Sequence, residues 1–473
     1  MKNTILAAAL TFFTGFSIAA QTPCNNGFAG NYPCDGFDLQ SHIPLTIFNA
    51  TAANDSWGWV DPVTEREYGI VGLNDGTVFI DISDPVNPIY LGKLPTHTSE
   101  STWRDIKVYN NHAFIVSEAA GHGMQVFDLN RLTNVTNPPV TFDEDAHYNG
   151  FGNAHNIIIN EDTGYAYGLG TNTYNGGSHF INIQDPQNPV AAGGFAEDFY
   201  THDAQVLLYN GPDADYAGRE ILVSSSGSEQ YISIVDVTDK ANPQSISTIG
   251  YSNVGYTHQG WFTENQRYFL VGDEFDENEV GFNTRTIIFD LEDLDNPVEH
   301  FEFFGTTTAI DHNGYIKDDK YYLANYAAGL RVMDVSNIAN EEMEEIAYFD
   351  TYTSDNNASY NGVWNVYPYF PSENVMITDR SGGFFLVKSN TLGTSTNNIS
   401  DVSIYPNPSN GILTIQTRIN PISEISIHDM SGKLISTDTF ETLNQVSLDI
   451  ENLDSGLYFL TINNVITRRI VKI

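Results

Sequence analysis

Residues 78–88 read VFIDISDPVNP, an apolar strand followed by an aspartate and a turn that ends in Asn-Pro. Clear copies are FINIQDPQNP (180–189) and IVDVTDKANP (234–243). Weaker copies end at Asn137-Pro138 and Asn296-Pro297, one reads VMDVSN (332–337), and FFLV (384–387) follows Gly382-Gly383 without the aspartate or the turn. Apolar runs bounded by Asp, Asn and Pro are typical of short strands and turns. We therefore interpret this segment as a structural repeat.

The spacing of the copies predicts a β-propeller. The strand centres are 44 to 54 residues apart and lie at Asp81, Asp128, Asn182, Asp236, Asp290, Asp334 and Lys388. Between the first two centres, residues 89–92, 103–109 and 113–117 are three further apolar strands. Four short strands in a unit of this length are typical of a propeller blade. We expect an all-β, seven-bladed propeller.

The ends of the repeated region predict how the ring closes. The seventh copy lacks the strand that should follow its turn, and an unassigned strand at 38–45 precedes the first copy. We expect this N-terminal strand to complete the seventh blade, because closure removes a free sheet edge. Residues 389–400 are rich in Ser, Thr, Asn and Gly and are interpreted as a linker after a propeller at 21–388. Residues 401–473 form a second, small all-β unit, in which strands are expected at 424–428, 446–450, 456–462 and 466–472.

Composition narrows the class of partner. The 473 residues are 41% hydrophobic and 12% aromatic, enough for a buried core. Lys and Arg total 20 against 60 Asp and Glu, a formal net charge of -40. Such a field repels phosphate backbones and anionic membranes, so no nucleic acid partner is expected. It attracts cations, although solubility alone would also account for it.

The N-terminus predicts export. A basic start, an apolar run from Thr4 to Ile18 and small residues before Gln21 describe a signal peptide over 1–20. Later stretches fall short of the ~20 apolar residues that a membrane span needs, so no transmembrane segment is expected. Cys24 and Cys34 follow the signal peptide and are expected to pair in an oxidising compartment. A metal site built on these two cysteines is the alternative.

The last unit resembles the type A C-terminal sorting domain of type IX secretion substrates. The resemblance is carried by YPNP (405–408), DMSGK (429–433), SGLYF (455–459) and the terminal RRIVKI (468–473). It implies a β-sandwich at 401–473 that the type IX secretion machinery recognises. It further implies a protein released from, or anchored at, the outer cell surface of a Gram-negative bacterium.

Residues 24 to about 387 resemble the choice-of-anchor B family, whose members carry LVIVD-type propeller repeats. The matching segments are 24–34, 57–59, 101–107, 122–128, 154–156, 200–203, 256–261, 273–277 and 311–313. The resemblance implies a propeller with a variable C-terminal anchor. It implies no particular chemistry.

Alignment of the blades reveals a polar pair 20 to 27 residues after five of the strand centres. The pairs are Arg104-Asp105, His155-Asn156, His202-Asp203, His258-Gln259 and His312-Asn313; Trp57-Gly58 and Asn361-Gly362 (or Trp364) take the two remaining positions. If the strand that each pair opens is the innermost of its blade, the pairs form a ring at one mouth of the channel. The sequence therefore predicts a ligand site formed by these ten residues.

Four histidines in the ring, His155, His202, His258 and His312, could bind a divalent transition metal, because neutral imidazole is a common metal ligand. They could also transfer protons near neutral pH. Alternatively, each side chain only ties adjacent blades together by hydrogen bonds.

A second candidate is the acidic run 273–279. Its carboxylates Asp273, Glu274, Asp276 and Glu277 could bind Ca²⁺, although the run lacks the spacing of an EF-hand. A loop that is simply solvated is the alternative.

The sequence leaves three candidate functions for the protein: a binding propeller for an unknown extracellular ligand, a metal-dependent or acid/base hydrolase or lyase, and a structural surface module. The sequence leaves open whether the protein is an enzyme.

Overall fold

A computed structural model describes residues 21–197 and 199–390, and residues 402–472 with gaps at 406, 408, 418–420, 429–432, 454 and 464–465. The predicted signal peptide and most of the predicted linker lie outside these residues. The chain divides into two compact units, one ending at Asn390 and one beginning at Thr391. Each unit is described by itself.

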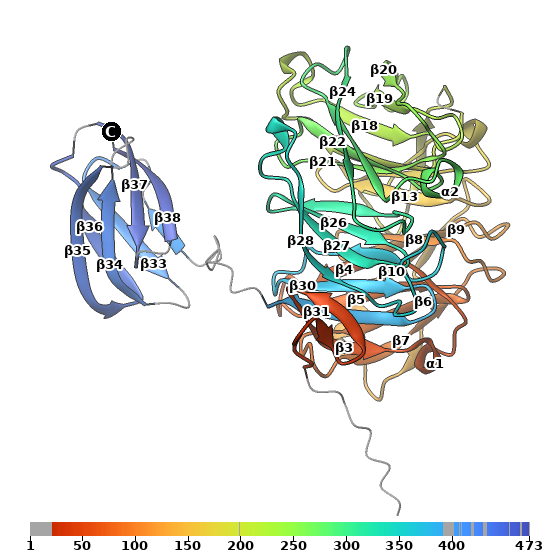
Figure 1. The fold of residues 1–473 in the computed structure, drawn as a ribbon, viewed down its shortest axis with the longest axis horizontal. Helices are drawn as coiled ribbons and strands as arrows, with labels where there is room; N and C mark the ends of the chain where they lie inside the picture. Colours follow the sequence, from red (N-terminus) through yellow and green to blue (C-terminus); the bar gives the residue numbers. More distant parts are fainter. Residues whose placement is uncertain are drawn as a thin grey trace, which may run out of the picture. The chain divides into compact units, whose positions relative to one another are not determined.

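The described part of the first unit is built from antiparallel sheets whose strands follow one another in the chain (Figure 1). The first sheet contains β4 (Ala53–Val60), β5 (Glu67–Leu73), β6 (Gly76–Asp81) and β7 (Ile89–Pro95), with β11 (Val140–Thr141) parallel to β7. The second contains β8 (Arg104–Tyr109), β9 (His112–Ser117), β10 (Met124–Asp128) and β12 (Ala146–Tyr148). The third contains β13 (Asn156–Asn160), β14 (Tyr165–Leu169), β15 (His179–Asn182) and β16 (Val190–Gly194).

The same order continues along the chain. The fourth sheet contains β17 (Asp203–Leu208), β18 (Glu220–Ser225), β19 (Ile232–Asp236) and β20 (Gln244–Ile249). The fifth contains β21 (Thr257–Phe262), β22 (Tyr268–Asp273), β23 (Arg285–Asp290) and β24 (Val298–Phe304). The sixth contains β25 (Gly314–Lys317), β26 (Lys320–Asn325), β27 (Gly329–Asp334) and β28 (Glu344–Phe349), extended by β2 (Tyr32–Asp35) and β1 (Phe28–Ala29).

The last sheet of the unit joins its two ends. It contains β29 (Val363–Tyr367), β30 (Asn374–Asp379), β31 (Gly383–Ser389) and the N-terminal strand β3 (Phe37–Ile43). β3 pairs with β31 in antiparallel register, with Leu39 opposite Val387. The first strand of each sheet contacts the first strand of the next, and β29 in turn contacts β4. The N-terminal segment thus lies beside strands more than 300 residues later in the chain.

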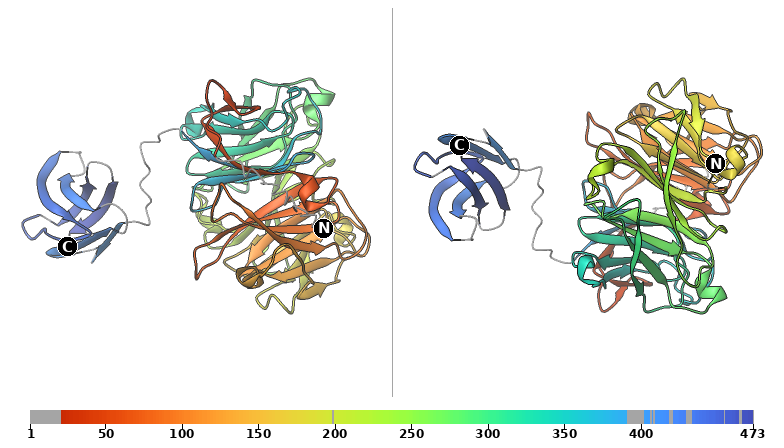
Figure 2. Two further views of the ribbon diagram at one scale, coloured as in Figure 1. Left: turned by 90° about the horizontal axis from the view of Figure 1, so that it is seen from below. Right: turned by 90° about the horizontal axis from the view of Figure 1, so that it is seen from above.

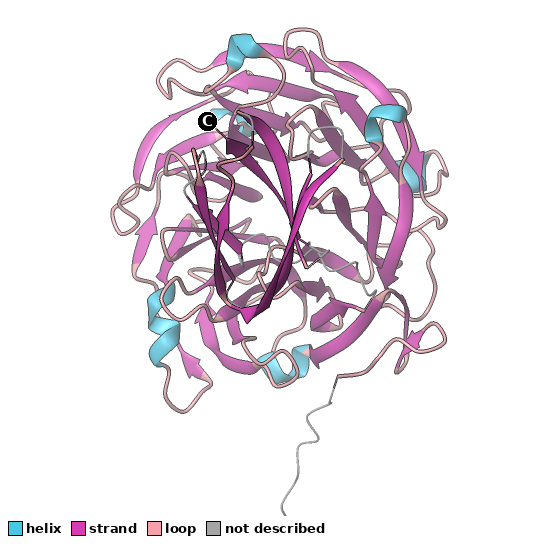
Figure 3. Ribbon diagram, turned by 90° about the vertical axis from the view of Figure 1, so that its left-hand side faces the viewer, coloured by secondary structure: helices cyan, strands magenta, loops and turns pink. Residues whose placement is uncertain are grey.

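The short helices lie in the connections between strands, most of them at the rim of the first unit (Figure 3). They are α1 (Leu45–Phe48), α2 (Asp276–Glu279) and the 3-10 turns η1 (Leu129–Asn134), η2 (Tyr174–Gly176), η3 (Ala214–Tyr216) and η4 (Ile338–Asn340). The core lies between neighbouring sheets: Phe79 of β6 stacks on Phe127 of β10, with ring centroids 4.4 Å apart. Aromatic side chains between sheets supply the large apolar areas that hold the sheets together. In the part of the chain that the structure describes, no helix is long and apolar enough to cross a membrane.

The repeated segment is a third strand followed by a hydrogen-bonded turn. In the first copy, Nδ2 of Asn87 donates to Asp84 (2.9 Å), and the backbone N–H of Ser83 donates to Asp81 (3.0 Å). The same Asn–Asp turn bond closes the turns at 185–188, 239–242 and 293–296. The aspartates and asparagines of the repeat are therefore structural, since they satisfy the backbone and the side chains of the turn.

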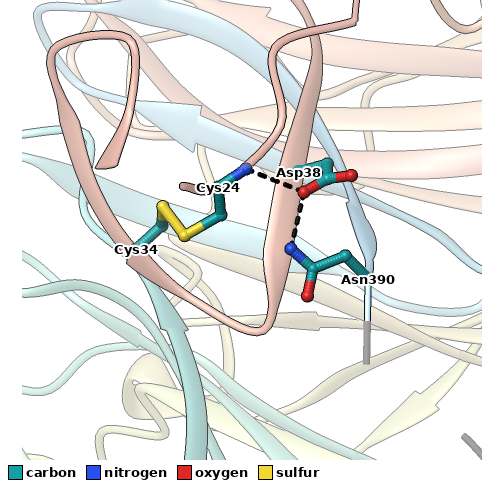
Figure 4. The surroundings of a disulfide bond; sticks show 4 residues. All are labelled: Cys24, Cys34, Asp38 and Asn390. Carbon is teal, nitrogen blue, oxygen red and sulfur yellow. Dashed lines mark hydrogen bonds between the residues drawn. A yellow bond between two sulfur atoms is a disulfide. The ribbon is translucent and has the colours of Figure 1, made fainter. Parts of the chain in front are cut away.

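The predicted disulfide is confirmed, because Cys24 and Cys34 are bonded, with a Cα–Cα distance of 6.1 Å. It holds the N-terminal loop beside β3 (Figure 4). Oδ1 of Asp38 accepts hydrogen bonds from the backbone N–H of Cys24 (2.8 Å) and from Asn390 (2.6 Å). The two ends of the first unit are thus linked by side chains as well as by the β3–β31 pairing.

The second unit consists of two small sheets (Figure 2). One contains β32 (Val402–Tyr405), β33 (Ile412–Thr417) and β36 (Gln445–Asp449); the other contains β34 (Ile422–His428), β35 (Leu434–Leu443), β37 (Gly456–Ile462) and β38 (Ile466–Lys472). Their apolar faces form a common core that includes Ile415, Ile425 and Leu460. Such a two-sheet arrangement is a β-sandwich.

Candidate functional site

Four of the predicted ring residues come together as an arc of histidines. The ring centroids of His155 and His202 are 4.3 Å apart, those of His202 and His258 4.4 Å, and those of His258 and His312 4.3 Å. Trp364 continues the arc, with its ring 4.8 Å from His312. Each residue lies in or just before the first strand of its sheet. We call His155, His202, His258 and His312 the histidine arc.

The arc lines a cavity of about 460 Å³. The other lining residues are mostly aromatic or charged: Thr102, Trp103, Glu118, Tyr200, Tyr256, Glu274, Phe275, Tyr326, Tyr360, Trp364 and Arg380. Trp103 is 44% exposed, whereas Trp364 is buried. An apolar hollow with a few convergent polar groups is the usual form of a small-molecule site.

Hydrogen bonds set the proton positions on two of the arc histidines. Nδ1 of His202 is 2.9 Å from the carbonyl oxygen of His258, and Nδ1 of His312 is 2.6 Å from that of Trp364. Because a carbonyl only accepts, each Nδ1 carries the proton and each Nε2 keeps its lone pair. Burial holds the pKa of His202 and His258 well below the usual range and lowers that of His312 to about 3. These imidazoles are neutral at pH 7.

Glu274 lies opposite the Nε2 atoms of two arc histidines, His258 and His312. Its Oε2 is 3.8 Å from Nε2 of His258, and its Oε1 is 3.8 Å from Nε2 of His312. The hydroxyl of Tyr326 donates to Oε1 (2.9 Å). Burial raises the pKa of Glu274 to about 8. One ligand atom from each of His258, Glu274 and His312 lies within 4.8 Å of the others. Two ligands at about 2.1 Å from one metal can be up to about 4.2 Å apart, so 3.8 Å suits a shared cation.

A second acid–imidazole pair lies on the same cavity wall. Oε1 of Glu118 is 2.6 Å from Nδ1 of His155. A carboxylate that accepts from one ring nitrogen fixes the tautomer, so the other nitrogen keeps its lone pair. His155 is thus arranged as a proton acceptor or as a ligand at Nε2.

The second member of four of the five predicted pairs links adjacent sheets. Asn156 donates to the carbonyl of His202 (3.0 Å), Gln259 accepts from the N–H of Gly314 (3.0 Å), and Asp105 accepts from the N–H of Ile157 (2.9 Å). Asn313 donates to Asp55 (3.2 Å) and to Asn365 (3.1 Å), and Asp105 forms a buried ion pair with Lys107 (2.7 Å). Asp203 accepts from the N–H of Ala204 (2.7 Å), and burial raises its pKa to about 7. The hydrogen bonds of these residues are structural.

Arg104 differs from the other predicted ring residues. It is buried, and its guanidinium donates to the carbonyl of Leu73 (3.1 Å), to Thr96 (2.8 Å) and to Nε2 of His122 (3.0 Å). The residue before it, Trp103, lines the large cavity instead. Of the two positions that lack a polar pair, Trp364 reaches the cavity. The ring of Trp57 lies elsewhere, with Nζ of Lys107 over its face and the rings of Tyr315 and Tyr367 at its edges.

The side chains of the acidic run 273–279 have separate roles. Glu279 is exposed, whereas the other four carboxylates are buried or partly buried. Both oxygens of Asp273 accept from neighbours, including the N–H groups of Gly255 (2.8 Å) and Tyr256 (2.7 Å). Asp276 pairs with the buried Arg285 (2.6 Å). Glu277 is buried, and both its oxygens lack a hydrogen-bond partner among the described residues. Only Glu274 of the four predicted ligands reaches the cavity.

Sequence reasoning overlooked the tyrosines of the cavity. Tyr200 and Tyr256 each stand two residues before an arc histidine, in the related segments YTHD and YTHQ. That shared spacing was an available signal. Tyr326 and Tyr360 carry no such pattern, and they reach the site from other loops.

Comparisons with known proteins identify the second unit. Residues 403–473 match the family of the secretion system C-terminal sorting domain. No curated protein matches the chain. Among solved structures, hydrazine synthase from Kuenenia stuttgartiensis aligns with a TM-score of 0.52 at 10% identity, over 72% of this chain and 97% of that one. At this identity the likeness concerns the fold alone.

Two further structures align less closely. A protein from Lactobacillus plantarum gives a TM-score of 0.46 at 12% identity, over 84% of this chain and 98% of that one. PorZ, an essential surface component of the type-IX secretion system of Porphyromonas gingivalis, gives a TM-score of 0.41 at 11% identity, over 93% of this chain and 58% of that one.

The sorting domain at 403–473 shows that the protein is exported by type IX secretion and is secreted or attached at the outer surface of a Gram-negative bacterium.

Proposed function

We propose that the first unit is a closed seven-bladed propeller of the choice-of-anchor B family. The contacts between successive first strands, including β29 with β4, and the β3–β31 pairing support closure. The sequence segments that resemble this family run through the whole unit and support the assignment. An experimental structure of the unit with one sheet missing from the ring would contradict it.

The function we propose is metal-assisted binding of a small extracellular ligand in the cavity. His258, Glu274 and His312 hold a divalent transition metal, and the aromatic wall holds the organic part of the ligand. The observation that carries this proposal is the placement of the Nε2 atoms of two neutral imidazoles, His258 and His312, 3.8 Å from the two oxygens of one partly buried carboxylate. Three protein ligands leave the metal a position for a ligand from solution.

The surroundings of the three residues support a cation. The backbone carbonyl that accepts from Nδ1 of His312 orients this ring, as outer groups do at metal sites. A metal would also relieve the cost of burying Glu274, because the carboxylate could ionise beside it. Burial and then the charge of Asp273 raise the pKa of Glu274, and burial and then the charges of Asp276 and Asp273 raise the pKa of Asp311, so the region has an excess of acid groups.

Zinc titration of the chelator-stripped full chain by calorimetry tests this function. We expect His258→Ala or His312→Ala to weaken binding at the cavity at least about 100-fold, since even outer-shell changes cost 10–100-fold. His300→Ala is the matched control, because His300 lies on β24 of the same sheet and contacts the carbonyl of Ile338 (3.0 Å). Unchanged zinc affinity and stoichiometry in both cavity variants would contradict the proposal.

A hydrolase or lyase is the second candidate function, favoured by the His155–Glu118 pair beside the proposed metal. Turnover of an extracellular polysaccharide or peptide that is lost in His155→Ala, with zinc binding retained, would support it.

A purely structural role is favoured by the bonds from His202 and His312 to neighbouring carbonyls. Loss of thermal stability in His312→Ala without any zinc binding by the parent chain would support that role.

A further inference from the structure

A second group of histidines lies outside the cavity and outside the predicted polar pairs. His97 lies in the loop 96–103 that connects β7 of the first sheet to β8 of the second. His147 lies in β12, the outer strand of the second sheet, and Glu144 precedes that strand. The three side chains therefore meet between two neighbouring sheets, near β7 of the first and β12 of the second.

The three residues are close enough to share one ion. Nδ1 of His97 is 2.9 Å from Oε1 of Glu144 and 3.2 Å from Oε2. The rings of His97 and His147 are stacked, with centroids 3.7 Å apart and an interplanar angle of 10°. One ligand atom from each residue lies within 4.8 Å of the other two. Two ligands of one zinc ion at tetrahedral angles are about 3.3 Å apart, so the ligand atoms are near enough, and one of the two stacked rings must turn for both lone pairs to point at the ion.

Outer contacts fix the orientation of two of these groups. Nε2 of His147 is 2.7 Å from the carbonyl oxygen of His122, so Nε2 carries the proton and Nδ1 keeps its lone pair. Gln125, which lies opposite His147 in the register of β10 and β12, donates to Oε2 of Glu144 (2.8 Å). At bound metals, a ligating histidine usually donates its other N–H to a carbonyl, and a ligating carboxylate accepts a hydrogen bond from a neighbouring group. His147 and Glu144 have these two kinds of contact.

The position of His122 depends in turn on Arg104. Nδ1 of His122 is 3.0 Å from the carbonyl oxygen of Gly123, and its Nε2 accepts from Arg104 (3.0 Å). Arg104 also donates to Thr96, the residue before His97 (2.8 Å). One buried side chain therefore binds the side chains of two residues beside the group: Thr96, which precedes His97, and His122, whose carbonyl accepts from His147. This gives Arg104 a role that its place among the polar pairs did not indicate.

We propose that His97, Glu144 and His147 form a second site for a divalent transition metal, separate from the cavity. The metal takes the place of the proton between His97 and Glu144 and is bound by two imidazole nitrogens and one carboxylate. The side chains of His97 and Glu144 are 33% and 25% exposed, so an ion can enter from solution. Imidazole and carboxylate together suit zinc and similar ions better than calcium, which prefers oxygen ligands alone.

Metal at this site would fix one end of the loop 96–103. The other end of the same loop carries Thr102 and Trp103, which line the cavity. Binding at the outer site would thereby restrict the loop that forms part of the cavity wall. The site acts as a clamp between the first two sheets.

Zinc titration of the full chain in a cavity-deficient background isolates the second site. The background variant is His258→Ala/His312→Ala, and we expect it to bind one equivalent of Zn²⁺. Adding His147→Ala or Glu144→Gln should weaken that binding at least about 100-fold. His112→Ala is the matched control, because His112 lies on β9 of the same sheet and contacts the carbonyl of Asn110 (2.8 Å). Far-ultraviolet circular dichroism of each variant checks that the fold is retained.

The outcomes separate this proposal from the proposed function. If the background variant binds no Zn²⁺, or if His147→Ala and Glu144→Gln leave its affinity unchanged, the second site is refuted, and the cavity proposal is unaffected. If the background variant retains all the zinc binding of the parent chain and His147→Ala removes it, the second site stands and the cavity proposal fails. Substitution with Co²⁺ adds a spectroscopic readout, because absorption bands of tetrahedral cobalt should vanish in His147→Ala but persist in His112→Ala.

Discussion

At the scale of single residues, Asp350 is a carboxyl group that folding removes from water. It is 3% exposed and follows β28. Burial raises its pKa to about 7 and nearby Asp379 adds to the rise, although the N–H of Tyr352 and the charge of Arg331 oppose it. A carboxyl whose pKa is higher in the folded state binds a proton more tightly there. It therefore costs stability as the pH rises from about 4 to about 7.

We expect Asp350→Asn to become relatively more stable than the parent chain as the pH increases. The amide has no charge to bury and can still accept from Tyr352. Between pH 5 and pH 8 the difference in the free energy of unfolding should grow by about 2 to 3 kcal/mol in favour of the variant. Urea unfolding at the two pH values measures this difference.

Asp355→Asn serves as the control for this change. Asp355 also accepts the backbone N–H two residues later (3.0 Å), but it is exposed. We expect no comparable change with pH in this variant. Parallel stability curves for Asp350→Asn and the parent chain between pH 5 and pH 8 would show that the Asp350 explanation is wrong.

Single residues also mark the limit of prediction from sequence. Alignment of the copies predicted that His155, His202, His258 and His312 lie close together, because equivalent positions in repeated units become neighbours. The same spacing included Arg104, whose partners Thr96 and His122 belong to no repeat. Likewise, the sequence could not show which carboxylates of the acidic run bind structural partners, because those partners lie elsewhere in the chain. Asp276 pairs with Arg285, and Asp273 accepts from the backbone of Gly255.

At the scale of elements, the repeated turn contains one hydrogen bond between two side chains. In the copy at 185–188, Nδ2 of Asn188 donates to Asp185 (2.9 Å). A hydrogen bond of this kind contributes about 1 kcal/mol. The bond joins two side chains on the surface, so its loss leaves the packing between the sheets unchanged.

We expect Asn188→Ala to lower the free energy of unfolding by about 1 kcal/mol, and Asn87→Ala to have a similar effect in its own turn. The two changes should add, because the turns share no contacts. Denaturant unfolding measures each effect. Gln187→Ala is the control, since it keeps the backbone N–H that donates to Asp185 (3.2 Å). A double variant as stable as the parent chain would show that these bonds contribute nothing.

The elements themselves could be predicted well, because each copy carries its own strand and turn residues. The copies also marked a strand of every sheet of the first unit. The sequence pattern placed each polar pair at the start of an innermost strand only as a condition, and in the structure each pair lies in or just before the first strand of its sheet. This placement depends on hydrogen bonds between strands, such as Asn156 opposite Leu169, and strand-forming residues alone do not specify them.

At the scale of the whole molecule, the first unit depends on its N-terminal strand. Removal of residues 21–44 would leave β31 without its neighbour β3 and would take away the ring of His42, which stacks 4.0 Å from Phe385. An unpaired apolar strand edge is a site for association between chains.

We expect the chain without residues 21–44 to show a lower midpoint of thermal unfolding and to form oligomers in size-exclusion chromatography. A chain without residues 391–473 is the control. It should keep the midpoint of the first unit, because the two units have separate cores. A monomeric N-terminal deletion variant with an unchanged midpoint would contradict the stabilising role of β3.

The pairing of β3 with β31 also sets the order of events during biogenesis. Leu39 leaves the ribosome early, and its partner Val387 follows only after almost the entire unit has been made. A contact across such a long stretch of chain forms slowly, because the intervening loop has to be closed first. β3 therefore stays unpaired until β31 has been synthesised. A product truncated before β31 differs from the complete chain because its β3 strand remains exposed.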